Sequence, residues 1–198
     1  MDTAPQSGLA GAAPPAASAP QTPSNLDQTI RRRNSREWAV QMLFALDFAP
    51  IDGSLDEFFA DFWTQQREII IDSNDNPEIA LRNFDGETSK THRVCAEQLV
   101  EGVRAHIDEI DSRIDSCLDH WSIQRIGGTD RNVLRCAFYE LFFAGGATPP
   151  AIVINEAIDI AKYFSARESG RFVNGILGKA AKELDGPIRY KAPAPAFS

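Results

Sequence analysis

Two clusters of basic side chains, one near each end of the sequence, are the residues best suited to chemistry in this chain. Residues 31–36 contain four Arg and no acid. Residues 162–191 contain seven bases against three acids, whereas residues 37–161 contain nine bases against 23 acids. If folding brings the two basic ends together, they can bind the phosphates of a nucleic acid, and the acidic middle suits a basic partner.

The second cluster lies on one face of a helix predicted near the end of the sequence. On a helical wheel, Arg167, Arg171 and Lys182 share a face with Gly175 and Gly178. The opposite face is apolar and comprises Phe172, Val173, Ile176, Leu177, Ala180, Ala181 and Leu184. Because Gly inside a helix costs about 1 kcal/mol relative to Ala, the glycines indicate that a ligand comes close to the backbone. The alternative is that they are tolerated, or that the helix ends near Gly178.

The first cluster opens another predicted helix. Arg32, Arg33 and Arg36 put positive charge at the N-terminal end of that helix, where it opposes the helix dipole unless an anion neutralises it. A basic, solubilising end is the alternative. Lys162, by contrast, suits the dipole at the end of its own helix. Tyr163 beside it is either a platform for stacking on bases of single-stranded RNA or a core residue.

Several other kinds of site are disfavoured. The sequence has no glycine-rich phosphate loop and no HExxH or GxSxG motif. Its three cysteines are far apart and form no CxxC pair, which argues against a disulfide framework or a zinc site and for a reducing cytoplasm. One group of carboxylates is predicted to lie on the solvated face of a helix: Asp108, Glu109, Asp111 and Asp115. We therefore predict a binding protein that is not an enzyme and that uses no metal or cofactor.

The elements that must position the basic clusters are all helical. Helical spacing of apolar residues predicts seven helices, at 34–48, 55–71, 88–107, 108–121, 130–144, 149–164 and 165–184, with a loop at 72–87. Ser54 with Glu57, and Ser165 with Glu168, are predicted to form capping boxes, and Thr148 is predicted to be an N-cap. No segment alternates like a strand, and no apolar run is long enough to span a membrane. We predict an all-α fold.

The ends of the chain have a different composition. The start is rich in Ala and Pro and lacks the basic start and apolar core of a secretory signal, so residues 1–29 are predicted to be a disordered tail. We expect a helical domain over residues 30–186 and a flexible tail over residues 187–198.

Four stretches resemble the NusB family of bacterial transcription antitermination factors. They are residues 154–164 (INEAIDIAKYF), 172–175 (FVNG), 130–141 (DRNVLRCAFYEL) and 31–44 (RRRNSREWAVQMLF). The resemblance implies two packed antiparallel helical subdomains, over about 30–107 and 108–186. It also implies binding of boxA-type single-stranded RNA from ribosomal RNA leaders. The implied partners are the small-subunit ribosomal protein NusE and the RNA polymerase antitermination complex.

The resemblance also assigns residues to these roles. The RNA contacts that it implies are Arg32, Arg33, Arg36, Lys162, Glu168 and Ser169, to which the basic face of the last helix adds Arg167 and Arg171. Phe44 and Asp130 correspond to the surface that faces the protein partner, and Phe44 also lies off the apolar face of its helix.

At two places the sequence departs from the NusB pattern in a way that affects the expected RNA binding. Two alternative functions also remain open. An extra residue interrupts the Arg run at Asn34-Ser35, and Cys117 stands where some relatives have a tyrosine near the RNA. One alternative is an RNA-binding module related to that of ribosomal RNA cytosine methyltransferases, which the length of 198 residues disfavours. The other is a homodimer whose RNA surface is covered.

Overall fold

The computed structural model describes residues 25–49, 53–119, 122–166 and 168–184, with side chains from residue 33 onward. Over these ranges the chain is all-helical, as predicted, with eight α-helices and one short 3₁₀ helix and no strand. The elements are α1 (Asn25–Phe48), α2 (Leu55–Ser73), α3 (Pro77–Phe84), α4 (Glu87–Ala105), α5 (Ile107–Cys117), η1 (Ile123–Arg125), α6 (Gly128–Phe142), α7 (Pro150–Phe164) and α8 (Ser169–Leu184).

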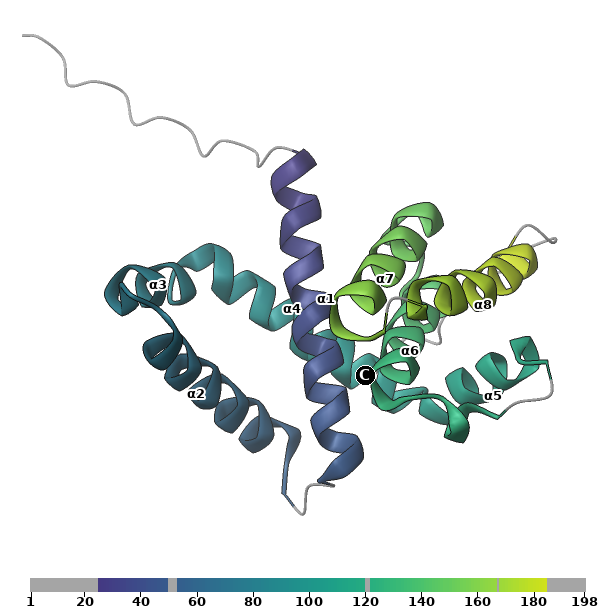
Figure 1. Cartoon of the computed structure of the whole chain (residues 1–198), viewed down its shortest axis with the longest axis horizontal. Coiled ribbons are helices and arrows are strands. Elements are labelled where there is room, and N and C mark those ends of the chain that lie inside the picture. The colour runs from purple at the N-terminus through teal and green to yellow at the C-terminus, as the bar shows by residue number, and fades with distance from the viewer. Residues whose placement is uncertain (1–24, 50–52, 120–121, 167, 185–198) are drawn as a thin grey trace, which may run out of the picture.

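Helix α1 runs through the middle of the molecule and divides it into two groups of helices (Figure 1). On one side α2 and α3 pack on each other, and α4 packs along α1. On the other side α6 is central, with α5, α7 and α8 around it. The two groups meet where α1 and α4 contact α6. Helix α6 therefore contacts both α1 and α8, which carry the two basic clusters.

The core explains why α6 occupies this position. Its residues from Asn132 to Phe138 are all buried, so the helix has no wide polar face. Phe138 and Leu134 of α6, Met42 of α1, and Ile110 and Ile114 of α5 are among the largest fully buried side chains. A helix that is buried on every side must be surrounded by other helices, and its buried polar side chains, Asn132 and Arg135, form hydrogen bonds with Asp47 and Asp111.

Several helix ends follow from local sequence. Ser54 accepts a hydrogen bond from the backbone N–H of Glu57, and the Glu57 carboxylate accepts one from the backbone N–H of Ser54, which confirms the first predicted capping box. After α6 the chain turns through Gly145 and Gly146 with φ of 68° and 75°. Only glycine adopts that left-handed backbone without strain, so this pair separates α6 from α7.

Other predicted boundaries were wrong. Helix α1 begins at Asn25, before the predicted start, so Arg32, Arg33 and Arg36 do not lie at its N-terminal end as predicted. Helix α3 lies inside the predicted loop. Helix α3 is short, but Phe84 at its end is buried against Trp38 and Trp63, so tertiary packing stabilises a helix whose length alone is marginal. Helix α5 ends at Cys117 and not at residue 121.

Two predicted caps were also misplaced. The N-cap of α7 is Pro149 and not Thr148, whose side chain is buried beside α4 and α6. Helix α8 begins at Ser169, so Ser165 and Glu168 lie before it and do not form its predicted capping box. Most of the two predicted tails lies outside the described residues, and the domain bounds stay predictions.

Candidate nucleic-acid interface

The first basic cluster separates into an exposed part and a buried part. Arg33 Nε donates to Glu37 Oε1 at 2.9 Å, and both side chains are partly exposed. Arg36 is only 5% exposed. Its Nε and Nη2 donate to Oε1 and Oε2 of Glu140, each at 2.6 Å, which forms a bidentate pair between α1 and α6. The side chain of Arg32 lies outside the described residues.

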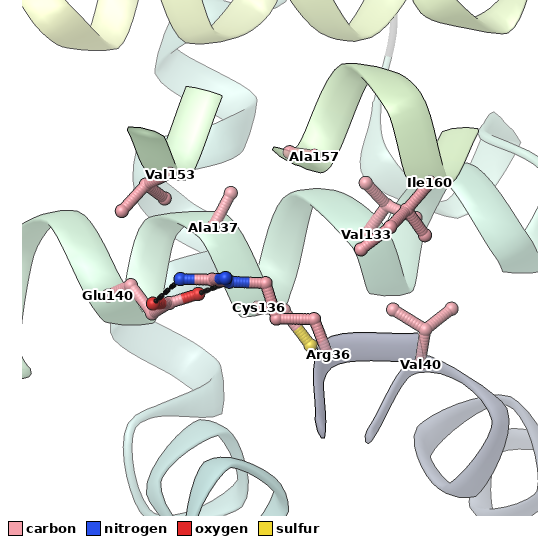
Figure 2. A pocket seen from close by; sticks show the side chains of 9 residues that line it. All are labelled: Arg36, Val40, Val133, Cys136, Ala137, Glu140, Val153, Ala157 and Ile160. Carbon is pink, nitrogen blue, oxygen red and sulfur yellow. Dashed lines mark hydrogen bonds and ion pairs between the residues drawn. The ribbon is translucent and has the colours of Figure 1, made fainter. Parts of the chain in front are cut away.

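Figure 2 shows the Arg36 side chain reaching from α1 to Glu140 on α6. Val153 and Ala157 of α7 also line this site. These residues enclose a cavity of about 10 Å³. The structure therefore places Arg36, which we predicted to contact RNA, inside the junction of α1, α6 and α7. A direct contact between its guanidinium and a strand at the surface is not available in this arrangement.

Helix α7 brings a carboxylate to the same junction. Burial raises the pKa of Glu156, and the charges of Arg36 and Arg33 oppose that rise. The pKa of Arg33 is raised by the hydrogen bond that Arg33 donates to Glu37, and the charges of Glu156 and Asp159 act in the same direction. Glu37, Glu140 and Glu156 thus neutralise much of the positive charge at this end of α1.

The hinge between α7 and α8 holds the next group of predicted residues. Lys162 is exposed, and its Nζ donates to Asp159 at 3.1 Å. Gly170 packs against the Lys162 stem so closely that a Cβ there would lie 2.7 Å from Cγ of Lys162. Glu168 is exposed, but Ser169 is buried. Arg167 lies outside the described residues. The hinge therefore presents Lys162 and Glu168 to solvent and turns Ser169 inward.

Helix α8 has the two faces that its sequence predicts. Arg171, Gly175, Gly178 and Lys182 are exposed, and a Cβ at either glycine would meet nothing within 4 Å. The opposite face is buried and includes Val173, Ile176, Leu177 and Ala180. Within the described part of the chain, no packing contact requires glycine at these two positions. Phe172, which we placed on the apolar face, lies at its edge and is 37% exposed.

Phe172 lines a groove that the sequence did not predict. The groove runs between the end of α5, the start of α6 and α8, and its volume is about 520 Å³. Five charged residues line it, the bases Arg125, Arg171 and Lys179 and the acids Asp119 and Asp130. Apolar side chains share the lining, among them Leu118, Ile126, Phe172 and Ile176. Because three separate segments form this groove, only the concentration of bases after residue 162 hinted at it.

Lys179 and Cys117 meet at one end of this groove. Lys179 Nζ donates to the backbone carbonyl of Cys117 at 3.0 Å and also to the carboxylate of Asp119. Burial raises the pKa of the Cys117 thiol, which keeps it in its neutral form at neutral pH. Cys117 therefore supplies an apolar wall here and no charge.

The predicted partner residues lie where α1 ends, next to the groove, which Asp130 also lines. Phe44 is 39% exposed, and its ring centroid lies 4.8 Å from that of the more exposed Phe48. Both rings approach Gly128 at the start of α6, where a Cβ would lie 3.0 Å from the Phe44 ring. Asp130, also partly buried, follows on the same turn. The prediction from sequence missed Phe48, which lies one helical turn after Phe44.

A network of ion pairs fixes α1 against α6 beside these rings. Asp47 accepts hydrogen bonds from Arg131 at 2.8 Å, Asn132 at 2.9 Å and Arg135 at 3.0 Å. Burial opposes the charge of Asp47, but these donors hold its pKa below the ordinary value. Arg135 also donates to Asp111 at 2.7 Å. Asp111 is therefore part of an interhelical pair, contrary to the prediction that it lies on a solvated face.

A family comparison and curated relatives decide which family this is. The model of the NusB family matches residues 33–182. The transcription antitermination protein NusB of Koribacter versatilis is 34% identical over 165 residues, which cover 83% of this chain and 98% of that protein. The NusB protein of Bdellovibrio bacteriovorus is 35% identical over 151 residues, which cover 76% of this chain and 95% of that protein.

This chain belongs to the NusB family.

Solved NusB structures share its fold. A crystal structure of antitermination factors NusB and NusE in complex with dsRNA matches with a TM-score of 0.60 and 27% identity, over 78% of this chain and 98% of that one. NusB of T. maritima matches with a TM-score of 0.59 and 33% identity, over 77% of this chain and 91% of that one.

Two further findings bear on this NusB-family chain. In the described part of the chain, no three His, Cys, Asp or Glu side chains come together as a metal site. Among the same residues, no helix is both long enough and apolar enough to cross a membrane.

Proposed function

We propose that this chain is a transcription antitermination factor that acts in the cytoplasm. It binds boxA-type single-stranded RNA of ribosomal RNA leaders together with the ribosomal protein NusE, within the RNA polymerase antitermination complex. The observation that carries the proposal is the groove beside α8, which Arg125, Arg171 and Lys179 line together with apolar side chains and the carboxylates of Asp119 and Asp130, in a chain whose relatives are transcription antitermination proteins. Its role is binding, and it needs neither a cofactor nor catalysis.

The RNA surface that we propose extends from the Arg run within α1 across the hinge to the groove. The described charged residues along it are Arg33, Lys162, Glu168, Arg171, Arg125 and Lys179, and the predicted contacts Arg32 and Arg167 are adjacent to two of them in sequence. Arg36 supports this surface from below, because its pair with Glu140 fixes α1 on α6. Exposed bases on this surface neutralise phosphates and release counterions, so the binding must weaken as salt rises.

Two exposed aromatic rings favour binding of single-stranded RNA over binding of a duplex. Tyr163 is 73% exposed, beside Lys162 on the hinge, and Phe172 lies on the other side of the hinge at the groove. Unpaired bases stack on such rings, whereas the bases of a duplex are already stacked on each other.

The protein partner contacts a neighbouring surface, formed by Phe44, Phe48 and Asp130, which meets the groove at Asp130. Two adjacent exposed rings supply apolar contact area, and Asp130 adds a carboxylate. A basic ribosomal protein complements both features. NusE accompanies NusB in a related structure, which supports the choice of this partner.

A binding titration tests the proposal. A labelled single-stranded boxA-like oligonucleotide is titrated with the full chain over a salt series, with and without the NusE protein. The logarithm of the binding constant is expected to fall with the logarithm of the salt concentration by about 0.7 per phosphate contacted. The unlabelled duplex of the same sequence is expected to compete more weakly.

Other results would contradict this proposal in different ways. Equal competition by the duplex would assign the surface to double-stranded RNA. A dimer in light scattering that dissociates before RNA binds would indicate that the RNA surface is covered in the free protein. The absence of binding to either RNA would overturn the function itself.

A further inference from the structure

One hydrogen bond lies where the two surfaces described above meet, at Asp130, which also lines the groove. Ser169 Oγ, in the first turn of α8, lies 2.8 Å from Asp130 Oδ2, in the first turn of α6. A carboxylate only accepts, so the single hydroxyl proton of Ser169 points to Asp130. The Ser165 hydroxyl, 3.0 Å from Ser169 Oγ, then donates to Ser169. Because Ser169 is only 6% exposed, its hydroxyl serves this joint and not the solvent-facing surface.

The Asp130 end of this joint belongs to the partner surface. Gly128, two residues before Asp130, lies against the Phe44 ring, and a Cβ there would come within 3.0 Å of Phe44 and 3.7 Å of Phe48. A partner that contacts the two rings therefore also contacts the first turn of α6. Any displacement of that turn carries Asp130 with it.

The Ser169 end belongs to the RNA surface. Gly170, the next residue, packs on the Lys162 stem, and Arg171 and Phe172 follow at the groove. The position of the first turn of α8 therefore sets where Lys162, Arg171 and Phe172 stand relative to one another. The affinity for RNA that contacts these side chains therefore depends on the position of that turn.

We propose that Ser169 is a positioning residue that couples partner binding to RNA binding through Asp130. The inference rests on the proposed function, since it needs both surfaces to be occupied. The second oxygen, Asp130 Oδ1, is buried and has no hydrogen-bond partner among the described residues, so this carboxylate is held from one side. A basic partner that docks beside Asp130 stabilises the carboxylate in its present orientation. The hydrogen bond to Ser169 then holds α8 in its RNA-binding position.

This coupling is reciprocal. A partner that tightens RNA binding by some factor must itself bind tighter to the RNA-bound protein by the same factor, and coupling of this kind commonly amounts to between 5-fold and 150-fold. A physical path between two sites does not by itself demonstrate coupling, so the test must measure the coupling directly.

The experiment measures the RNA dissociation constant with and without saturating NusE for the full chain and its variants. The coupling factor is the ratio of the two constants, and we expect it to be about tenfold or more in the unaltered protein. Ser169→Ala is expected to reduce the factor at least fivefold. Ser165→Ala is the matched control, because it removes the other hydroxyl but leaves the hydrogen bond to Asp130, and it is expected to keep the factor within twofold.

Thermal melting shows whether Ser169→Ala is folded. If it is not, Ser169→Cys keeps the size of the side chain and replaces a strong donor with a weak one, so it should also reduce the factor. An unchanged coupling factor in the folded variant would overturn the inference and assign the cooperation to direct contacts between partner and RNA. A factor of one in the unaltered protein would overturn it as well, while the proposed function stands as long as RNA and NusE each bind. Failure of the unaltered protein to bind RNA would overturn the proposed function itself.

Discussion

Basic side chains lie both in the junction of α1, α6 and α7 and in the groove between α5, α6 and α8. Their surroundings differ between the two regions. In the junction, Arg36 is buried and both oxygens of Glu140 accept its hydrogen bonds. In the groove, Arg171 is exposed, and Lys179 is held at one end by a carbonyl and a carboxylate. The first region uses its charge to join helices, whereas in the second the charge of Arg171 stays exposed to solvent, which is why we propose this groove for RNA.

The difference shows what determines the role of a basic residue. Arg33 and Arg36 belong to one short run and lie about one helical turn apart, yet one is partly exposed and the other buried. A buried cation whose partner is present contributes little net stability, but removing either partner leaves an uncompensated charge. A surface ion pair contributes little in either case.

The largest expected effect tests the junction. Arg36→Ala is expected to lower the free energy of unfolding by about 3–5 kcal/mol, because Glu140 would remain buried without its cation. Arg33→Ala, the matched control on the same helix, is expected to cost about 0.5 kcal/mol or less. Denaturant unfolding measures both. Equal losses would show that burial does not separate these two residues.

The next effect tests the groove. Replacing Arg171 and Lys179 together with Ala is expected to weaken RNA binding about tenfold at low salt and to flatten the salt dependence by about 1.4, which corresponds to two phosphate contacts. The melting temperature should change little, since both side chains are exposed. Arg82→Ala removes an exposed base from α3, on the other side of α1, and should leave RNA binding unaffected (Figure 1). Equal weakening by Arg82→Ala would show that only net charge matters.

A third prediction extends the comparison from charges to aromatic rings. Phe44→Ala is expected to weaken NusE binding by at least about 1 kcal/mol, as anchors in interfaces do. Its cost to stability should stay near 1 kcal/mol, well below the roughly 3–5 kcal/mol of a fully buried Phe, because the ring is partly exposed. Thermal melting and a pull-down of the same variant provide the two readouts. A strongly lowered melting temperature would place Phe44 in the core.

The smallest expected effect concerns pH, and its sign differs between two carboxylates. The pKa of Glu156 is raised in the fold, so the unfolded chain binds fewer protons than the folded one just above pH 4.5, and stability from this group falls as pH rises. The pKa of Asp47 is lowered, so its contribution is present above pH 3.8 and is lost as pH falls.

These signs lead to opposite results for two amide variants. Glu156→Gln is expected to leave the free energy of unfolding at neutral pH unchanged or slightly higher, whereas Asp47→Asn is expected to lower it. Unfolding measured from pH 4 to pH 7 checks both. A loss of stability for Glu156→Gln at neutral pH would show that its charge is needed to balance Arg36.

Much of the fold was predictable because helices form from local patterns. The apolar spacing gave most helices their correct place, and the Ser54–Glu57 capping box is present as predicted. Helix α3 was missed because it is short, and the burial of Phe84 that stabilises it depends on the distant Trp38. The start of α8 was misplaced because Ser169, which begins the helix, forms its hydrogen bonds with Asp130 and Ser165.

The sequence by itself determined the all-α class, the two basic clusters, the polar face of α8 and the NusB family, because each of these depends on residue type and short-range spacing. Only the tertiary structure decided that Arg36 is buried while Arg33 is not, and that Lys179 and Arg125 share a groove. It also decided that Ser169 donates a hydrogen bond to Asp130. Arg36 and Glu140 are 104 residues apart, and Asp130 and Ser169 are 39 apart. No local pattern encodes such pairs, because they form only when packing of the apolar faces brings separate helices together.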